Sequence, residues 1–435
     1  MAPVDVPVAL LGYGTVGAAV NRFLHENADD IERVTGYHLR VVKALVRDLS
    51  KERDFPAAAG ILTTEFAEIA DNSEITLVAE VMGGLDPTHD YILRLLRSGK
   101  PVVTANKQLL AQRGAELFST AQGAGVQLRF EASVCAAIPV IKVLRESLVV
   151  TNVHQILGIV NGTTNYILTQ MELGASYEEA LSEAKRHGYA EMDPTEDVSG
   201  ADAAAKMAIL ATVAFGSRVT LADVQFEGVE HITSAHVSAA KQMEMVIRLV
   251  GRATLVDDRY DVRVSPALVD RAHPLASVEG PFNAVMLQGD AIREITLEGP
   301  GAGGIETASA VIADMVSIIG TTGTGFLHND ACWRTLDQLP AGELCSPFYL
   351  QIAVDDRPGV LARVAERLAA HGVSVARLVQ AQIEGGAILH VISHEAAYGA
   401  VDSALEEIGR LSESREIAAA FPVISRRGIS ELGWA

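Results

Sequence analysis

The 435-residue sequence has few cysteines, few aromatic residues and no excess of basic charge. Its three cysteines, Cys135, Cys332 and Cys345, are widely spaced and form no CxxC pair, which excludes a disulfide framework and fits a reducing compartment. The formal net charge of −20 repels polyanions, and no basic run is interleaved with aromatic residues. We therefore expect no nucleic-acid partner.

Long apolar runs are absent as well. No stretch reaches the roughly 18 residues that a membrane span requires, and the N-terminus, MAPVDVPVALLGYG, has no basic segment ahead of its apolar residues, unlike a secretory signal. We expect a cytoplasmic protein without membrane association. The sequence is nevertheless 49% hydrophobic, enough for two or three domains with cores of their own.

Strand-like and helix-like segments alternate over the first 130 residues. LRVVKALVRD, ITLVAEVMG and KPVVTANK are short apolar runs that end in polar or glycine residues. This order predicts an α/β fold with a Rossmann-like doubly wound parallel sheet in a domain over 1–130.

The remaining sequence predicts two further units joined by a linker. Residues 131–325 mix longer helices with strands, which predicts an α+β domain, and we expect the helix at 298–320 to return to the first domain. Residues 326–345 form the predicted linker. Residues 346–435 follow the order strand, helix, strand, hairpin, strand, helix, and FPVISRR supplies a final strand, giving βαββαβ.

The motif LGYGTVG follows the first predicted strand and opens a helix. Its glycines satisfy GxGxxG, a turn whose backbone N–H groups and helix dipole hold a pyrophosphate. We predict dinucleotide binding by this turn, which comprises Gly12, Tyr13, Gly14, Thr15, Val16 and Gly17.

Cofactor choice depends on the end of the second strand, ALVRDLSKER. An NAD-specific site usually places an acidic residue there. Here Arg47 comes first, so positive charge is available for a 2′-phosphate and NADP is favoured. NAD stays open because Asp48 is adjacent and the segment could be only a solvated loop.

A charged pair interrupts the apolar helix predicted in GADAAAKMAILATVAFG. Asp202 and Lys206 lie four residues apart and so share one helix face. A surface ion pair is the ordinary explanation. However, the neighbours of Lys206 on the helix are largely apolar, which favours a partly buried lysine of the kind that catalysis uses.

Two more polar segments are candidates for a site. Lys107 in TANK follows a strand at the carboxyl edge of the sheet, where ligands of open α/β folds bind, although it could be a surface charge at a helix start. The segment GYAEMDPTEDVSGADAAAK gathers carboxylates ahead of Lys206. They could form an acidic loop, a cation site or a site for a substrate ammonium group.

Taken together, GYGTVG, TANK, FEASV, NGTTNYIL, GYAEMDPTEDVSGADAAAK and GPGAGG closely resemble homoserine dehydrogenase over about residues 6–325, and DRPGVL resembles the start of an ACT domain. The resemblance implies NAD(P)-dependent interconversion of aspartate 4-semialdehyde and homoserine, in threonine, methionine and isoleucine biosynthesis. It also implies that residues 131–325 carry catalysis and dimerisation, and that the protein is a homodimer or homotetramer.

The resemblance also implies residue roles. Lys206 would donate the proton, Lys107 would lie at the substrate and nicotinamide, and Asp202 would orient the lysine. Substrate contacts would come from Glu191, Asp197, Tyr189, Gly162 and Thr163, and further cofactor contacts from Thr104 and Gly303.

One loop departs from the family pattern. After FEASV the family usually has Ala-Gly-Gly, where this chain has Cys-Ala-Ala at 135–137. In the family the loop binds a monovalent cation, typically Na+, largely through backbone carbonyls. The implied ligands are Glu131, Val134, Ala136 and Ile138, but alanine restricts φ where glycine does not.

Two other functions compete. Cys135 could be the nucleophile of a phosphorylating semialdehyde dehydrogenase, but the nearest histidines in sequence, His154 and His187, carry no recognisable base motif. A non-catalytic amino-acid sensor could keep the ACT unit and an idle nucleotide fold. The joint presence of Lys107, Glu191 and the Asp202–Lys206 pair argues against it.

The C-terminal unit predicts regulation. Asp356, Pro358 and Gly359 lie between a strand and a helix whose exposed backbone N–H groups suit a carboxylate. By resemblance this loop holds a small amino acid, and threonine is the natural effector. An ACT fold kept only for assembly is the alternative.

Overall fold

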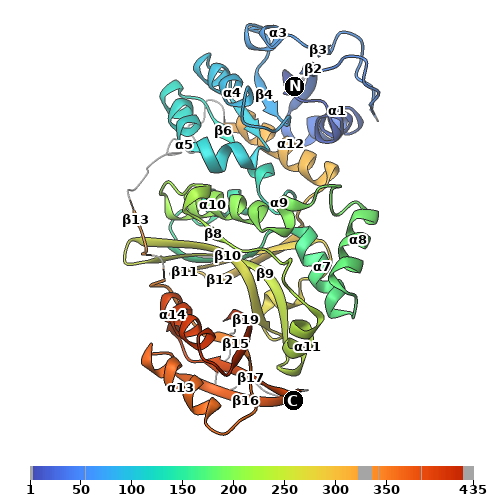
Figure 1. The fold of residues 1–435 in the computed structure, drawn as a ribbon. Helices are drawn as coiled ribbons and strands as arrows, with labels where there is room; N and C mark the ends of the chain where they lie inside the picture. The colour runs from blue at the N-terminus through green and yellow to red at the C-terminus, as the bar shows by residue number, and fades with distance from the viewer. Residues whose placement is uncertain (1–2, 54, 322–335, 341, 384, 425–435) are drawn as a thin grey trace. The chain divides into compact units, whose positions relative to one another are not determined.

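The computed structural model describes residues 3–53, 55–321, 336–340, 342–383 and 385–424 (Figure 1). The chain divides into two compact units, each built from three segments. The first comprises 1–156, 204–224 and 283–336, and the second 157–203, 225–282 and 337–435. Cys332 and the first part of the predicted linker, 326–335, lie outside the described residues.

The first unit contains the predicted parallel sheet. Its six strands lie in the order β3-β2-β1-β4-β5-β6, and every pairing is parallel. The prediction of a doubly wound Rossmann-like sheet is therefore confirmed. The strand order reverses between β1 and β4, and the crevice at their carboxyl ends is where such folds bind ligands. The strands are β1 (Val4–Leu11), β2 (Tyr37–Leu45), β3 (Leu62–Thr63), β4 (Leu77–Glu80), β5 (Val102–Thr104) and β6 (Leu128–Arg129).

Helices from distant parts of the sequence cover this sheet. Helix α12 (Gly304–Thr321) packs against α1 (Thr15–Glu26), and its buried residues Val311 and Met315 share one core with Val8 and Leu10 of β1. The other helical elements of the unit are α2 (Ala28–Thr35), α3 (Ala67–Ala70), α4 (Thr88–Arg97), α5 (Lys107–Ala124), α6 (Val140–Lys142) and the short turns Glu131–Ser133, Val143–Ser147 and Leu221–Asp223.

Three elements pass from one unit to the other along the chain: β7 (Val153–Ile159), α10 (Ala201–Phe215) and β11 (Phe282–Gly289). Strand β12 (Arg293–Pro300) belongs to the first unit. Helix α10 has few polar residues and is almost entirely buried, which explains why Asp202 and Lys206 stand out in it.

The second unit holds part of the region predicted to be α+β, namely 157–203 and 225–282. Strands β9 (Met245–Val256) and β10 (Arg259–Asp270) form an antiparallel hairpin that is paired along its whole length. Helix α7 (Gly162–Glu172) packs on β9 and is buried over most of its length because Thr, Tyr, Ile and Leu cover several of its faces. The other elements here are α8 (Tyr177–His187), α9 (Thr195–Val198), β8 (Gln225–Phe226), α11 (Ser234–Gln242) and the turn Pro274–Ser277.

The C-terminal residues have the predicted βαββαβ order. Four strands form an antiparallel sheet in the order β19-β15-β17-β16, and α13 and α14 pack on it around Val364, Leu368 and Ile408. The elements are β15 (Phe348–Val354), α13 (Val360–Ala370), β16 (Val375–Ile383), β17 (Gly386–Ser393), α14 (Tyr398–Gly409) and β19 (Ser414–Ile424), with the short strands β13 (Asp337–Gln338), β14 (Cys345–Ser346) and β18 (Ala396–Ala397).

The last strand is longer than the sequence suggested. It was expected in FPVISRR, but β19 begins at Ser414 because its alanine-rich first half continues to pair with β15 and so satisfies its backbone groups. At its other end, Val423 and Ile424 pair in parallel with Leu268 and Val269 of β10. The C-terminal sheet is thus continuous with the β9–β10 hairpin.

No helix among the described residues is long and apolar enough to cross a membrane.

Candidate functional site

The glycine-rich turn after β1 is shaped by close backbone packing. Gly12 has φ +105°, and a Cβ there would lie 2.9 Å from the backbone of Met82. A Cβ on Gly17 would lie 2.3 Å from the carbonyl oxygen of Gly12. Gly14 is the N-cap of α1 and provides no side-chain cap, so the first N–H groups of the helix remain available to a pyrophosphate.

Two neighbouring features complete this turn. The side chain of Tyr13 is buried, and its hydroxyl accepts a hydrogen bond from Asn21 Nδ2 at 2.7 Å. A Cβ on Gly304 would lie 2.8 Å from Thr15 Cγ2, and Gly303 has φ +131°. The second glycine-rich segment, GPGAGG, therefore meets the start of α1 in space.

The loop after β2 presents one exposed arginine. Arg53 folds back onto the loop and donates to the carbonyl oxygens of Lys51 and Asp48. Hydrogen bonds from the Ser50 hydroxyl and N–H lower the pKa of the Asp48 carboxyl. Arg47 is exposed beside that carboxylate.

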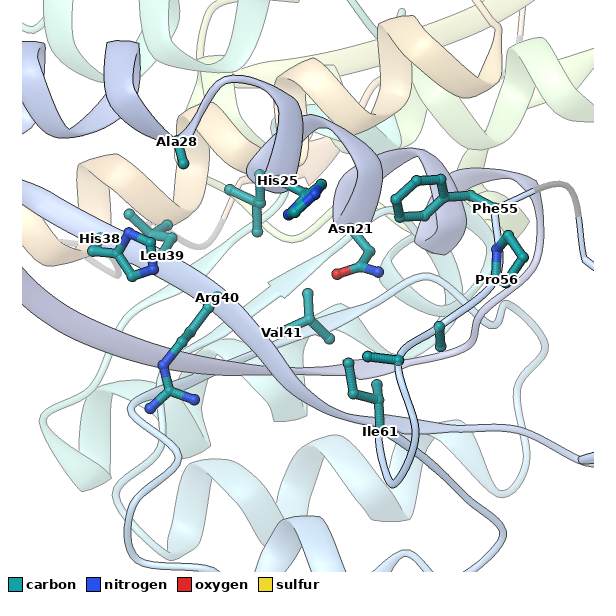
Figure 2. Close-up of a pocket in the computed structure, with 13 residues that line it drawn as sticks. Asn21, His25, Ala28, His38, Leu39, Arg40, Val41, Phe55, Pro56 and Ile61 are labelled. Atoms are coloured by element: carbon teal, nitrogen blue, oxygen red, sulfur yellow. The ribbon is translucent and has the colours of Figure 1, made fainter.

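The first unit also has a cavity beside strand β2. About 360 Å³ in volume, it lies among α1, β2 and the segment 55–61 (Figure 2). His25, Arg40 and Phe55 are among its lining residues, and none of the predicted cofactor residues lines it. The cavity is therefore distinct from the glycine turn.

In the second unit, Asn161 organises the predicted carboxylates. It is the N-cap of α7, where its Oδ1 accepts from Thr164 N at 2.8 Å. Its Nδ2 donates to Asp197 Oδ1 at 2.7 Å and to Asp202 Oδ2 at 2.8 Å. Asn161 was absent from the residues predicted from sequence. The signal was its place as the cap before GTT in NGTTNYIL.

The other predicted substrate residues surround this cluster to different degrees. Thr163 Oγ1 lies 2.6 Å from the carbonyl oxygen of Tyr189 and 3.0 Å from Asp197 Oδ2. The Tyr189 side chain is 43% exposed, and Glu191 is exposed. A Cβ on Gly162 would lie 2.6 Å from the carbonyl oxygen of Pro281, so this glycine permits close packing of α7.

The two predicted lysines differ in their place on a helix: Lys206 lies within α10, and Lys107 begins α5. Lys206 is only 8% exposed and follows Asp202, which is 3% exposed, by one turn of α10. Lys107 is the half-buried first residue of α5, whose N-cap Asn106 accepts from Leu109 N. Thr104, at the end of β5, is fully buried, and its hydroxyl donates to Glu80.

The predicted cation loop keeps an unusual conformation without glycine. Cys135 and Ala136 have φ of 55° and 38°, a region that costs an L-residue roughly 1–2 kcal/mol. The loop is closed by a hydrogen bond from Ile138 N to the Cys135 carbonyl oxygen. The loop therefore has left-handed backbone at two positions that are not glycine.

Glu131 supplies the carboxylate of this loop. Its two oxygens accept from Ile141 N and Lys142 N, both at 2.8 Å, and its own N–H donates to Asp314. Burial, with repulsion from Asp314, raises the pKa of Glu131 to about 7. Carboxylate and carbonyl oxygens are the donors that hard cations prefer, so the residues present fit such an ion. Within the described residues, no three His, Cys, Asp or Glu side chains gather as in a metal cluster.

Cys135 itself is buried and receives a weak hydrogen bond from Asn283 Nδ2 at 3.5 Å. His154 is exposed on β7, and the His187 ring stacks on Tyr189 in the second unit. A phosphorylating semialdehyde dehydrogenase needs a histidine base beside its cysteine nucleophile. The surroundings of Cys135, His154 and His187 give no support for such a pair.

The C-terminal unit has a cavity of about 370 Å³ at the turn between β15 and α13. Asp356 accepts from the side-chain amides of Gln380 and Gln382 on β16. Gly359, with φ +88°, is the N-cap of α13, and Pro358 precedes it. The cavity lies among all three residues that were predicted to be regulatory.

Comparisons with known proteins agree over three successive parts of the chain. Three family models match: the homoserine dehydrogenase NAD-binding domain over 12–131, homoserine dehydrogenase over 139–316 and the ACT domain over 348–413.

Individual relatives and solved structures that match this chain are homoserine dehydrogenases as well. The homoserine dehydrogenase of Bacillus subtilis is 36% identical, over 96% of this chain and 98% of its own length. The homoserine dehydrogenase of Corynebacterium glutamicum is 39% identical, over 96% of this chain and 93% of its own length. Among solved structures, a homoserine dehydrogenase from Thiobacillus denitrificans matches with a TM-score of 0.92 at 35% identity. The match covers 98% of this chain and 99% of that structure. A hyperthermophilic archaeal homoserine dehydrogenase in complex with NADPH matches with a TM-score of 0.61 at 28% identity. The match covers 73% of this chain and 98% of that structure.

Proposed function

Because the chain belongs to the homoserine dehydrogenase family and has its NAD(P)-binding and ACT domains, we propose that Lys206 is the proton donor and Asp202 its orienting partner. The supporting observation is the cluster around Asn161, which fixes Asp202 one helical turn before a buried lysine. The reaction interconverts aspartate 4-semialdehyde and homoserine.

The chemistry assigns a distinct task to each group. The nicotinamide cofactor, when bound, supplies the hydride. As the aldehyde carbon is reduced, its oxygen gains negative charge and needs a proton, which the Lys206 ammonium provides. Asp202 attracts that ammonium and limits the directions it can adopt, since its own carboxylate is held by Asn161. Lys107 provides a second positive charge at the carboxyl edge of the nucleotide sheet.

Recognition of the substrate's ammonium group falls to Asp197 and Glu191. Asp197 is held by the Asn161 amide and lies within hydrogen-bond distance of the Thr163 hydroxyl. A carboxylate accepts charge-assisted hydrogen bonds from an ammonium group, and these are stronger than bonds between neutral groups. Tyr189, Thr163 and Gly162 shape the surroundings of this carboxylate.

For the cofactor we propose NADP, with NAD as the weaker alternative. Arg53 is engaged within its own loop, whereas Arg47 is exposed and can meet a 2′-phosphate. Contacts to the rest of the dinucleotide are assigned to the glycine turn, Thr104, Lys107 and Gly303.

We also propose a monovalent cation, Na+, at Glu131 with the carbonyl oxygens of Val134, Ala136 and Ile138. The supporting observation is the tight turn at Cys135 and Ala136, which has left-handed backbone. Threonine is the proposed effector of the ACT cavity at Asp356, Pro358 and Gly359, and a homodimer or homotetramer is the proposed assembly.

The decisive experiment is an assay of NADPH formation from homoserine and NADP+ by the full chain, with L-serine as the control substrate. Phosphate-independent oxidation of homoserine that survives Cys135→Ser would support the proposal over a phosphorylating dehydrogenase. Lack of oxidation with either NADP+ or NAD+ would contradict it and leave the sensor as the better explanation.

A further inference from the structure

We propose that Glu80 is a positioning residue that ties the loop after β4 to the start of α5, and thereby sets the place of Lys107 relative to the glycine turn. The inference rests on the proposed role of Lys107. All of the residues involved belong to the first unit.

Glu80 is a fully buried carboxylate at the end of β4. Its Oε1 accepts from the backbone N–H groups of Met82 at 2.8 Å and Gly83 at 2.9 Å, and its Oε2 accepts from the Thr104 hydroxyl at 2.5 Å. Burying a carboxylate costs several kcal/mol unless donors compensate it, and an apolar residue would fill a strand end without that cost. The carboxylate is therefore placed there for its hydrogen bonds.

A second set of hydrogen bonds closes the connection between the two loops. Thr104 Oγ1 accepts from Asn106 N at 3.0 Å, and Asn106 Nδ2 donates to the carbonyl oxygen of Gly84 at 2.7 Å. Asn106 Oδ1 caps α5 by accepting from Leu109 N at 3.1 Å. The ring from Glu80 through Thr104 and Asn106 back to Gly84 thus fixes the first turn of α5.

This ring lies between two groups that the proposed reaction uses. On one side, Met82 is so near Gly12 that a Cβ there would lie 2.9 Å from its backbone, so the loop after β4 supports the glycine turn. On the other side, Lys107 is the first residue of α5, directly after Asn106. A shift of Glu80 or its donors would move the lysine relative to the bound dinucleotide, and misplacement by about 1 Å can lower a rate by about 100-fold.

Desolvation raises the pKa of the Glu80 carboxyl, while the hydrogen bonds from Thr104, the two N–H groups and the Asn106 side chain act in the opposite direction. These donors match the acceptor-only carboxylate. In Glu80→Gln one oxygen becomes an NH₂ group. If that group faces Thr104, the threonine hydroxyl, which already accepts from Asn106, loses its acceptor.

The test compares Glu80→Gln, Lys107→Met and the double variant in the full-length protein. Readouts are kcat and KM for homoserine, the Kd for NADP and the thermal midpoint. We expect Glu80→Gln to lower kcat by about 10-fold or more, with Kd changed by less than about 3-fold. Because Glu80 acts through Lys107, the double variant should be no slower than Lys107→Met alone.

Additive losses in the double variant, or a lower thermal midpoint with unchanged kcat, would overturn the proposal. If Glu80→Gln does not fold, Thr104→Val and Thr104→Ser carry the same test: the valine variant should lose kcat and the serine variant, which keeps the hydroxyl, should regain it. Asp261→Asn, at a buried carboxylate paired with Arg263 in the second unit, is the matched control. A wild-type protein without homoserine oxidation would instead refute the proposed function itself.

Discussion

Replacing Lys206 by methionine is the most direct test of the proposed chemistry. Methionine keeps the length and most of the volume of the lysine side chain, and the position is only 8% exposed on an otherwise apolar helix. The volume is therefore conserved, but the buried Asp202 carboxylate loses a positive charge one helical turn away, so the free energy of unfolding should fall by about 1–3 kcal/mol. The partner carboxylate, Asp202, remains hydrogen-bonded to Asn161.

The expected loss follows from the role of the group. The group that donates the proton in reduction accepts the hydroxyl proton in oxidation. A positioned general acid or base contributes about 10²–10⁴ in rate, so Lys206→Met should lower kcat for homoserine oxidation by at least about 100-fold, or about 2.7 kcal/mol. The Kd for NADP should stay nearly unchanged because the residue acts on the substrate oxygen. Steady-state absorbance of NADPH gives kcat, and fluorescence titration gives Kd.

Lys241→Met is a suitable control because Lys241 is an exposed lysine in the last turn of α11. It should retain full activity. Near-normal turnover of a folded Lys206→Met protein would refute the assignment of the proton donor. A parallel loss of cofactor binding would show that the lysine has a structural role instead.

Three further predictions concern the cofactor, the cation loop and the effector. Arg47→Ala should weaken NADP binding by roughly 1.5–3 kcal/mol and leave NAD almost unaffected; Arg40→Ala is the control, and equal losses for both cofactors would argue against a phosphate contact. The pKa of Glu131 is raised from a usual 4.5 to about 7, so folding favours the protonated carboxyl. In buffer without Na+ or K+, the free energy of unfolding should therefore fall as pH rises from about 4.5 to about 7, by about 3 kcal/mol at most. Urea titrations of Glu131→Gln should lack this component, and an unchanged pH profile would contradict the assignment. Threonine should inhibit the wild type but act much more weakly on Asp356→Ala, and equal inhibition curves, or none in either protein, would exclude control through this turn.

How much of this site the sequence could predict depended on how local each contact is. The glycine turn was readable because Gly12, Gly14 and Gly17 recur at a fixed spacing within one strand-turn-helix unit, whereas the close approach of Met82 to Gly12 was not. Lys206 stood out because its helix neighbours are apolar, a property of a single segment. The βαββαβ order was readable for the same reason, from patterns within each strand and helix.

The residues that were missed act over longer sequence separations. Asn161 meets Asp197 and Asp202 from a separate helix, and only the fold shows that one amide serves both carboxylates. Glu80 ends an apolar strand, where a charged residue normally reaches solvent. Its burial and its hydrogen bond to Thr104 depend on the pairing of β4 with β5.

The proposed threonine control has a physical route within the second unit. The turn at Asp356–Gly359 follows β15, which pairs with β19, and β19 pairs with β10 at Leu268 and Val269. Strand β10 pairs with β9, on which α7 packs, and the N-cap of α7 is Asn161, the residue that holds Asp202. Contiguity alone does not produce coupling, because an effector shifts an equilibrium only as far as it binds two arrangements differently. A usual coupling of about 1–3 kcal/mol would need only a small change at the Asn161 amide, since losing one charge-assisted hydrogen bond there is of the same size.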